Sequence, residues 1–276
     1  YFNNNSKGDE TTTYITNIRY YSKTGYNEKE SGCKNNTFPI TVDLGSSSVI
    51  ADGRNVGGAI GKSLIRNGNV TITDFSGTIS GKSNVGGAIG LNRSDVNYIE
   101  VTTSGTIIGG NDSDINLDDL ASPIDYDGSN VGGAVGYNIS RINQGIKVDN
   151  SGTIEGFGRN VGGAIGFCHF SEKNMFIDTI YVKLLGNARV IGHSRNVGGS
   201  LGYTLGNIHT VTTEIRGTSR VIGYMSVGGV VGFASAEVNA DTLAGTTGDN
   251  VKKNQVGYID TALAIIAADN AIEGTK

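Results

Sequence analysis

The stretch RNVGGAIG (Arg54–Gly61) returns five times, slightly varied, along this chain of 276 residues. The other copies are SNVGGAIG (Ser83–Gly90), SNVGGAVG (Ser129–Gly136), RNVGGAIG (Arg159–Gly166), RNVGGSLG (Arg195–Gly202) and MSVGGVVG (Met225–Gly232). Counted from the residue before each Val-Gly-Gly, the steps are 29, 46, 30, 36 and 30 residues. Such self-similarity indicates a repeat architecture. The chain therefore predicts a unit of about 30 residues, with insertions in the third and fifth units.

Each unit holds three short pieces that resemble β-strands. A second block precedes the glycine motif, as in SGTISG (Ser76–Gly81) and SGTIIG (Ser104–Gly109), and an alternating piece such as Val70 and Ile72 precedes that block. Period-two alternation with β-branched residues is typical of strands, and no unit shows a helical period. The sequence thus predicts an all-β fold, a parallel β-helix (β-solenoid) of about six to seven coils, with right-handedness taken as the usual case. A β-propeller fits less well, because its blades need roughly 40–50 residues.

Stacking the coils in register places equivalent residues about 4.8 Å apart in columns. Two predicted core columns are Val56, Val85, Val131, Val161, Val197 and Val227, and Ile60, Ile89, Val135, Ile165, Leu201 and Val231. The residue that heads each motif predicts a hydrogen-bonded ladder of Asn55, Asn84, Asn130, Asn160 and Asn196, since asparagine tolerates left-handed backbone and its amide can bond the next amide. The residue after each motif predicts an aromatic column of Tyr137, Phe167, Tyr203 and Phe233. Its parity with the core columns favours an inward orientation, whereas an outward one would let it stack sugar rings.

The motif VGG-hydrophobic-hydrophobic-Gly, seen in VGGAIG, VGGSLG and VGGVVG, resembles the GLUG motif. GLUG motifs occur in arrays in large bacterial surface and secreted proteins, including adhesin-like proteins and peptidases that cleave immunoglobulin A. The resemblance covers about residues 41–236. Here Ala or Ser usually replaces the Leu of the motif. Because the motif carries no catalytic residues, the resemblance implies only an exported, surface-associated setting.

The third-unit insertion, residues 110–129, is the main departure from the repeat. Its acidic opening places Asp112, Asp114, Asn116 and Asp118 at alternate positions, and hard cations such as Ca²⁺ bind several such oxygens. However, Leu117 stands where an EF-hand needs glycine, and Pro123 where it needs a bidentate Glu. The segment is therefore interpreted as a solvated acidic loop or a Ca²⁺ site. No other cofactor is predicted.

Composition and motifs exclude several function classes. The net charge of −4 and the absence of a basic block argue against nucleic-acid binding. No apolar run approaches the roughly 20 residues of a transmembrane helix. Cys33 and Cys168 lack zinc-site spacing and are expected to be unpaired, and the first glycine motif lacks a residue that a phosphate-binding loop requires. Carboxylates that could serve a polysaccharide-active enzyme are scattered over different strand positions: Asp74, Glu100, Asp149, Glu155 and Glu214.

The two ends do not match the repeat and are expected to cap it. Residues 1–40 read as an irregular cap or extended assembly segment, residues 41–236 as the solenoid, and residues 237–276 as a C-terminal cap. Within the last segment, Ile259–Ala271 predicts a short apolar helix. The expected function is a non-enzymatic adhesin or structural module, extracellular or at the cell surface, whose partner is a protein, a glycan or a copy of itself. A self-assembling fibre subunit and a polysaccharide-active β-helix enzyme remain alternatives.

Overall fold

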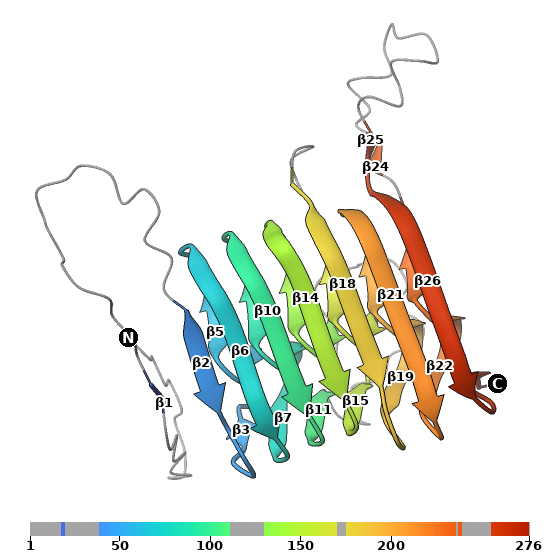
Figure 1. Cartoon of the computed structure of the whole chain (residues 1–276), viewed down its shortest axis with the longest axis horizontal. Coiled ribbons are helices and arrows are strands. Elements are labelled where there is room, and N and C mark those ends of the chain that lie inside the picture. Colours follow the sequence, from blue (N-terminus) through green and yellow to red (C-terminus); the bar gives the residue numbers. More distant parts are fainter. Residues whose placement is uncertain are drawn as a thin grey trace, which may run out of the picture.

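The chain forms strands that stack in parallel, as a computed structural model shows (Figure 1). The structure describes residues 18–19, 39–110, 130–169, 175–235, 237–238 and 255–275, and no helix occurs among them. The predicted all-β class with parallel strands is confirmed. Three sheets, here called sheets 1, 2 and 3, contain nearly all of the strands.

Sheet 1 has eight strands, which lie side by side across Figure 1. They are β1 (Ile18–Arg19), β2 (Ile40–Asp43), β6 (Asn67–Phe75), β10 (Val96–Thr103), β14 (Ile142–Asn150), β18 (Ile177–Leu184), β21 (Asn207–Gly217) and β26 (Tyr258–Ala268). All neighbours pair in parallel except β1 and β2, which pair antiparallel. From β2 onward, neighbouring strands of sheet 1 therefore come from successive units of the chain.

Sheets 2 and 3 repeat this arrangement with shorter strands. Sheet 2 contains β3 (Val49–Ile50), β4 (Arg54–Gly57), β7 (Thr78–Gly81), β8 (Ser83–Gly86), β11 (Thr106–Gly109), β12 (Val131–Gly132), β15 (Thr153–Gly156), β16 (Val161–Gly162), β19 (Arg189–Gly198), β22 (Arg220–Gly228) and β27 (Ile272–Gly274). Sheet 3 contains β5 (Ile60–Ser63), β9 (Ile89–Asn92), β13 (Val135–Asn138), β17 (Ile165–Cys168), β20 (Leu201–Thr204) and β23 (Val231–Ala234). A separate antiparallel pair joins β24 (Glu237–Val238) to β25 (Gln255–Val256).

Pairing runs from each unit to its equivalent in the next unit. Val131 is aligned with Val85 on one side and Val161 on the other, although 46 residues separate the first two. The third-unit insertion thus leaves the register unchanged. Parallel strands that pair between successive units, in three sheets around one core, are consistent with a parallel β-helix.

The core consists of aliphatic columns enclosed by the three sheets. The middle members of both predicted columns are fully buried, whereas Val227, Ile60 and Val231 at the ends are half-buried. A third column, Ile79, Ile107, Ile154, Val190 and Val221, is fully buried along its whole length. Stacking creates this core, because one unit alone would leave its apolar side chains exposed to water.

The glycine pair of each motif lets the backbones of successive units touch. A Cβ atom on Gly133 would lie 2.0 Å from the carbonyl oxygen of Gly163, so no larger residue fits there. The same close approach brings the amide nitrogen of Gly133 within 3.1 Å of the carbonyl oxygen of Gly162. These glycines therefore allow close backbone packing, as expected where two backbone segments approach closely.

The predicted C-terminal helix is wrong. Residues of Ile259–Ala271 instead form β26, which pairs in parallel with β21 from Tyr258 to Ala268. An isolated helix of this length is marginal in water. The free edge of β21 offers a full row of backbone partners, and that gain outweighs the helical propensity of the alanines.

Candidate functional site

The asparagines that head the motifs form a continuous chain of side-chain hydrogen bonds. Each amide nitrogen donates to the side-chain oxygen of the asparagine one unit earlier, at distances of 2.8–2.9 Å, in the order Asn196, Asn160, Asn130, Asn84, Asn55. All five have positive φ between 52° and 63°. Asparagine is therefore suited to this corner for two reasons, the left-handed backbone and the amide ladder.

A second polar column lies inside sheet 3, and the sequence reasoning missed it. Its members, eight positions after the head of each motif, are Ser63, Asn92, Asn138, Cys168, Thr204 and Ala234. Asn92 donates to Asn138 at 2.8 Å, and the amide of Asn138 lies 3.7 Å from the Cys168 sulfur. Burial raises the pKa of the Cys168 thiol to about 12. The signal in the sequence was a small or polar residue at a constant offset from the motif.

The aromatic column stacks as a column but does not point into the core. Tyr137 and Phe167 have ring centroids 4.9 Å apart, as do Phe167 and Tyr203, and Phe233 contacts Tyr203 edge-on at 5.1 Å. In each strand the next residue is buried on the inner side, so the aromatic rings lie on the outer side of sheet 3. Phe167 is only 2% exposed because both neighbouring rings cover it, while Phe233 at the end is 45% exposed.

The inward orientation predicted from parity is therefore wrong. Parity was misread because Gly136 occupies the inner side of the strand, where its Cβ position lies 2.5 Å from the Asn84 backbone. The outward column is nonetheless poorly arranged for sugar stacking. The faces of Tyr137, Phe167 and Tyr203 cover one another, with interplanar angles of 12° and 17°, so ring edges are turned to solvent. Sugar stacking requires an exposed ring face.

A group of ionisable side chains lies on the outer face of sheet 1, on β10, β14, β18 and β21. We call it the charged patch, and its members are Glu100, Lys147, Asp149, Tyr181, Lys183, Glu214 and Arg216. Strand registers align Glu100 with Lys147, Lys147 with Tyr181, and Lys183 with Glu214. Three carboxylates that the sequence analysis described as scattered, those of Glu100, Asp149 and Glu214, therefore share this face.

The members of the charged patch are bound to one another. The Lys147 ammonium lies 2.8 Å from Glu100 and 3.2 Å from Asp149. Arg216 donates from Nε to Glu214 at 2.8 Å, and the Tyr181 hydroxyl donates to the same carboxylate. The patch forms two groups of charge-assisted hydrogen bonds, one around Lys147 and one around Glu214, and such bonds are stronger than neutral ones.

These contacts shift the pKa values away from those useful in acid–base catalysis. The hydrogen bond to Glu214, with burial, raises the pKa of Tyr181, and hydrogen bonds to Glu100 and Asp149 raise that of Lys147. Hydrogen bonds from Tyr181 and Arg216 lower the pKa of Glu214. A general base should titrate near the working pH. Tyr181 and Lys147 both stay protonated near neutral pH, so neither can accept a proton as a general base.

Two histidines stand in similar local pairs. His193 lies 2.7 Å from Glu155 and stacks on Phe157 with ring centroids 4.4 Å apart. His209 lies 3.2 Å from Asp178 and stacks on Phe176. Within the described ranges no three His, Cys, Asp or Glu side chains gather to hold a metal ion. The predicted Ca²⁺ ligands Asp112, Asp114, Asn116 and Asp118 lie outside the described residues, as does Cys33.

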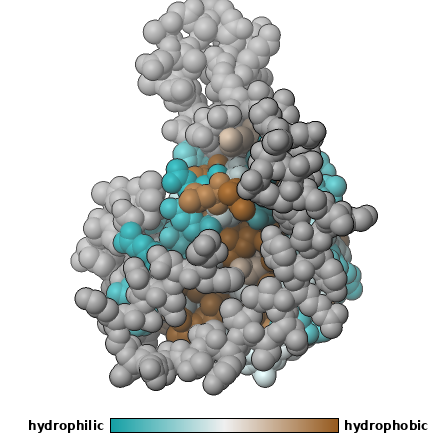
Figure 2. All heavy atoms as spheres, turned by 90° about the vertical axis from the view of Figure 1, so that its left-hand side faces the viewer, coloured by the Kyte–Doolittle hydropathy of each residue, from teal (hydrophilic) through white to brown (hydrophobic). Residues whose placement is uncertain are grey.

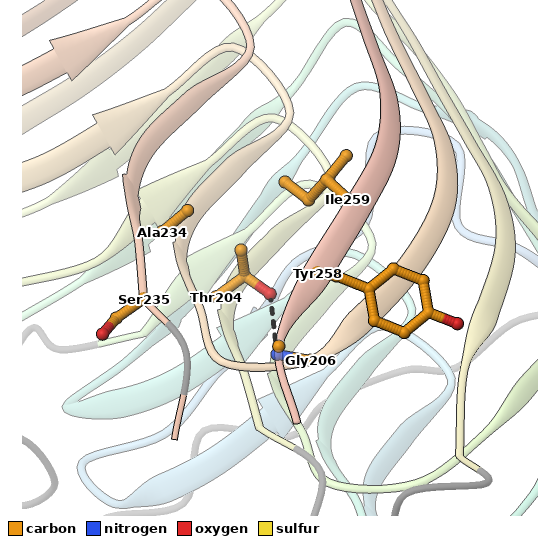
Figure 3. A pocket seen from close by; sticks show the side chains of 7 residues that line it. Thr204, Gly206, Ala234, Ser235, Tyr258 and Ile259 are labelled. Atoms are coloured by element: carbon orange, nitrogen blue, oxygen red, sulfur yellow. Dashed lines mark hydrogen bonds between the residues drawn. The ribbon is translucent and has the colours of Figure 1, made fainter. Parts of the chain in front are cut away.

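One pocket of about 250 Å³ lies near the C-terminal end of the stack, between β20, β23 and the start of β26 (Figure 3). It is lined by Thr204, Gly206, Ala234, Ser235, Gly257, Tyr258 and Ile259. The Thr204 hydroxyl already accepts a hydrogen bond from the Gly206 amide at 3.0 Å. Apart from the Tyr258 phenol the lining carries no ionisable side chain, so this pocket offers no catalytic group of the usual kinds.

No family model, no curated protein sequence and no solved structure matches the chain. Within the part of the chain that the structure describes, no helix has the length and apolar character needed to cross a membrane.

Proposed function

We propose that this chain is a right-handed parallel β-helix that serves as a non-enzymatic structural or adhesive module, at the cell surface or outside the cell. One observation carries the proposal: the residues that repeat are used in joining successive units. The asparagines bond one another, the paired glycines admit the neighbouring backbone, and the valine and isoleucine columns fill the core. The repeated residues thus hold successive units together in a rigid stack.

The resemblance of the glycine motif to GLUG repeats supports the proposed location, because those repeats occur in bacterial surface and secreted proteins. Contact with a protein or glycan partner is proposed for the surfaces that vary between units, above all the acidic insertion at residues 110–129. Ca²⁺ bound by Asp112, Asp114, Asn116 and Asp118 would stabilise the folded chain. Converting these four residues to alanine should abolish any rise in melting temperature caused by Ca²⁺, and an unchanged melting curve in the parent chain would remove the ion from the proposal.

The location is tested by treating intact cells of the source organism with protease. The protease should destroy the epitope of an antibody against residues 130–235 while the cells are still intact. A cytoplasmic marker should stay uncleaved in the same cells. Protection of the epitope until lysis would contradict an exported module. An experimentally phased crystal structure reads the handedness directly, and a left-handed coil would contradict that part of the proposal.

One observation favours a second function, a polysaccharide-active enzyme: Glu100, Asp149 and Glu214 share one face with Lys147 and Tyr181. The pKa directions argue against it, because the candidate bases remain protonated. Incubation with acidic and neutral polysaccharides, followed by an assay for new chain ends, decides the matter. Cleavage that disappears in Tyr181→Phe and Lys147→Met would establish the enzymatic function. The absence of cleavage with every substrate would rule it out.

A further inference from the structure

The C-terminal end of the stack carries most of the exposed apolar surface among the described residues. Figure 2 shows the N-terminal end face-on, with apolar side chains between polar ones. The exposed large hydrophobic residues at this end are Ile50, Leu64 and Ile65. In the last units they are Tyr224, Met225, Phe233, Tyr258, Leu263, Ile265, Ile266 and Ile272. An accumulation of exposed apolar side chains at one end of a fold is a candidate interaction site.

Strand β26 is apolar on both faces, unlike the other strands of sheet 1. Its inward residues Ala264 and Ile266 align with Thr213 and Ile215 of β21. Its outward residues Leu263 and Ile265 align with Thr212 and Glu214, in rows that are polar on the preceding strands. Leu263 is 48% exposed and Ile265 is 38% exposed. Apolar residues in outward rows are stabilised when they pair with apolar side chains of a further strand.

The backbone of β26 is also open on one side. Figure 1 shows β26 as the outermost strand of sheet 1, and among the described residues its only partner in the sheet is β21. At the opposite end the equivalent edge strand, β2, is paired with β1. Natural proteins usually protect long edge strands with charges, proline or a bulge. From Thr261 to Ala268 β26 has none of these features and keeps a regular register.

We propose that β26 pairs antiparallel with β26 of a second copy, about a two-fold axis at Ala264, and so joins two stacks end to end. A symmetric pair must be centred on a residue, because opposite side chains point to the same face. Centred on Ala264, the pairing sets Leu263 opposite Ile265 of the second copy, twice. On the inner face it sets Ile266 opposite Ala262, a large residue against a small one. Every outward apolar residue of the central segment thereby gains an apolar partner.

Head-to-tail pairing of β26 with β2 of a second copy fits less well. Continuing the parallel register would place Leu263 beside Thr41 and Ile265 beside Asp43, leaving both apolar side chains without apolar neighbours. It would also require β1 to leave the edge of β2. The self-complementary β26 pair needs neither, and it closes at two copies where a head-to-tail contact would extend into a fibre.

Sedimentation equilibrium of the full chain tests the proposal. The parent chain should reach the mass of a dimer, and Leu263→Lys should raise the dimer dissociation constant by at least about tenfold, since two cross-strand pairs are lost. Thr212→Lys is the matched control, because Thr212 occupies the same outward row one strand inside. It should leave the association unchanged.

Cross-linking tests the register separately. In a Cys33→Ser background, Ala264→Cys places two thiols across the proposed axis, within the Cα separation that a disulfide bridges. Mild oxidation should give a covalent dimer, whereas Ala267→Cys, three positions from the axis, should not. A parent chain that stays monomeric, oligomers that grow without limit, or cross-linking through Ala267→Cys but not Ala264→Cys would each overturn the proposal.

Discussion

Replacing Asn160 by alanine removes two rungs of the asparagine ladder at once. Asn160 is 1% exposed, donates to Asn130 at 2.8 Å and accepts from Asn196 at 2.8 Å. The substitution leaves one oxygen and one amide group buried without those partners, at about 1–3 kcal/mol each. Its φ of 63° adds about 1 kcal/mol for an alanine. We expect Asn160→Ala to lower the unfolding free energy by about 3–7 kcal/mol.

Urea denaturation, followed by circular dichroism, measures this loss. Asn160→Gly separates the two causes, because glycine tolerates the backbone but lacks the amide, and it should be about 1 kcal/mol less destabilised than Asn160→Ala. The control is Asn97→Ala, whose amide bonds Asn69 at 2.7 Å on the exposed surface and should cost less than about 0.5 kcal/mol. A loss below about 1 kcal/mol for Asn160→Ala would refute the reasoning that the ladder stabilises the stack.

Three further predictions concern packing, pH and thiol reactivity. Gly133→Ala should destabilise the fold by several kcal/mol in urea melts, because its Cβ would lie 2.0 Å from a carbonyl oxygen, while Gly53→Ala, with no atom within 4 Å, should change little. Since the folded state lowers the pKa of Glu214, that carboxylate stabilises the fold above its unfolded pKa of about 4.3, and the contribution should be lost as pH falls through the lowered value. Glu214→Gln should therefore show a shallower loss of stability between neutral and acid pH, and an unchanged slope would count against the Tyr181 and Arg216 contacts. In a Cys33→Ser background, Cys168 should react with a thiol reagent only after denaturation, because burial raises its pKa to about 12; rapid labelling of the native chain would disagree.

Much of the architecture followed from the spacing of one motif. A constant interval between Val-Gly-Gly copies predicts which residues share a column, since stacking sets equivalent positions above one another. The 46-residue step between Asn84 and Asn130 did not disturb this inference, because an insertion at a corner leaves the strand registers intact.

Local patterns were less reliable where tertiary contacts decided the outcome. Ile259–Ala271 has helical propensity but lies where an open sheet edge supplies backbone partners, and it forms a strand. The aromatic column was assigned inward because alternation was counted from Ile60. In the equivalent strand β13, however, Val135 and Asn138 are both buried although they lie three positions apart, so simple alternation does not hold through this short strand.

The charged patch could have been found from the sequence. Glu100, Lys147 and Tyr181 each lie between two β-branched residues of one strand, as in Ile99 and Val101, which places them in one outward row. The ion pairs themselves depend on side-chain conformation, which the sequence does not specify. The same holds for the exposed C-terminal edge, since exposure depends on what packs beyond the last strand.

The central claim is that equivalent strands of successive units stack in register. It is tested most directly by the distance between two spin labels on Thr41→Cys and Thr212→Cys, in a Cys33→Ser chain diluted with unlabelled protein. The two positions lie in one outward row, separated by 171 residues in sequence but by five strand spacings in space, through Thr71, Glu100, Lys147 and Tyr181. Electron spin resonance should give a narrow distribution centred near about 24 Å, widened by the label linkers. A broad distribution, or a separation of about twice that value, would contradict the stack.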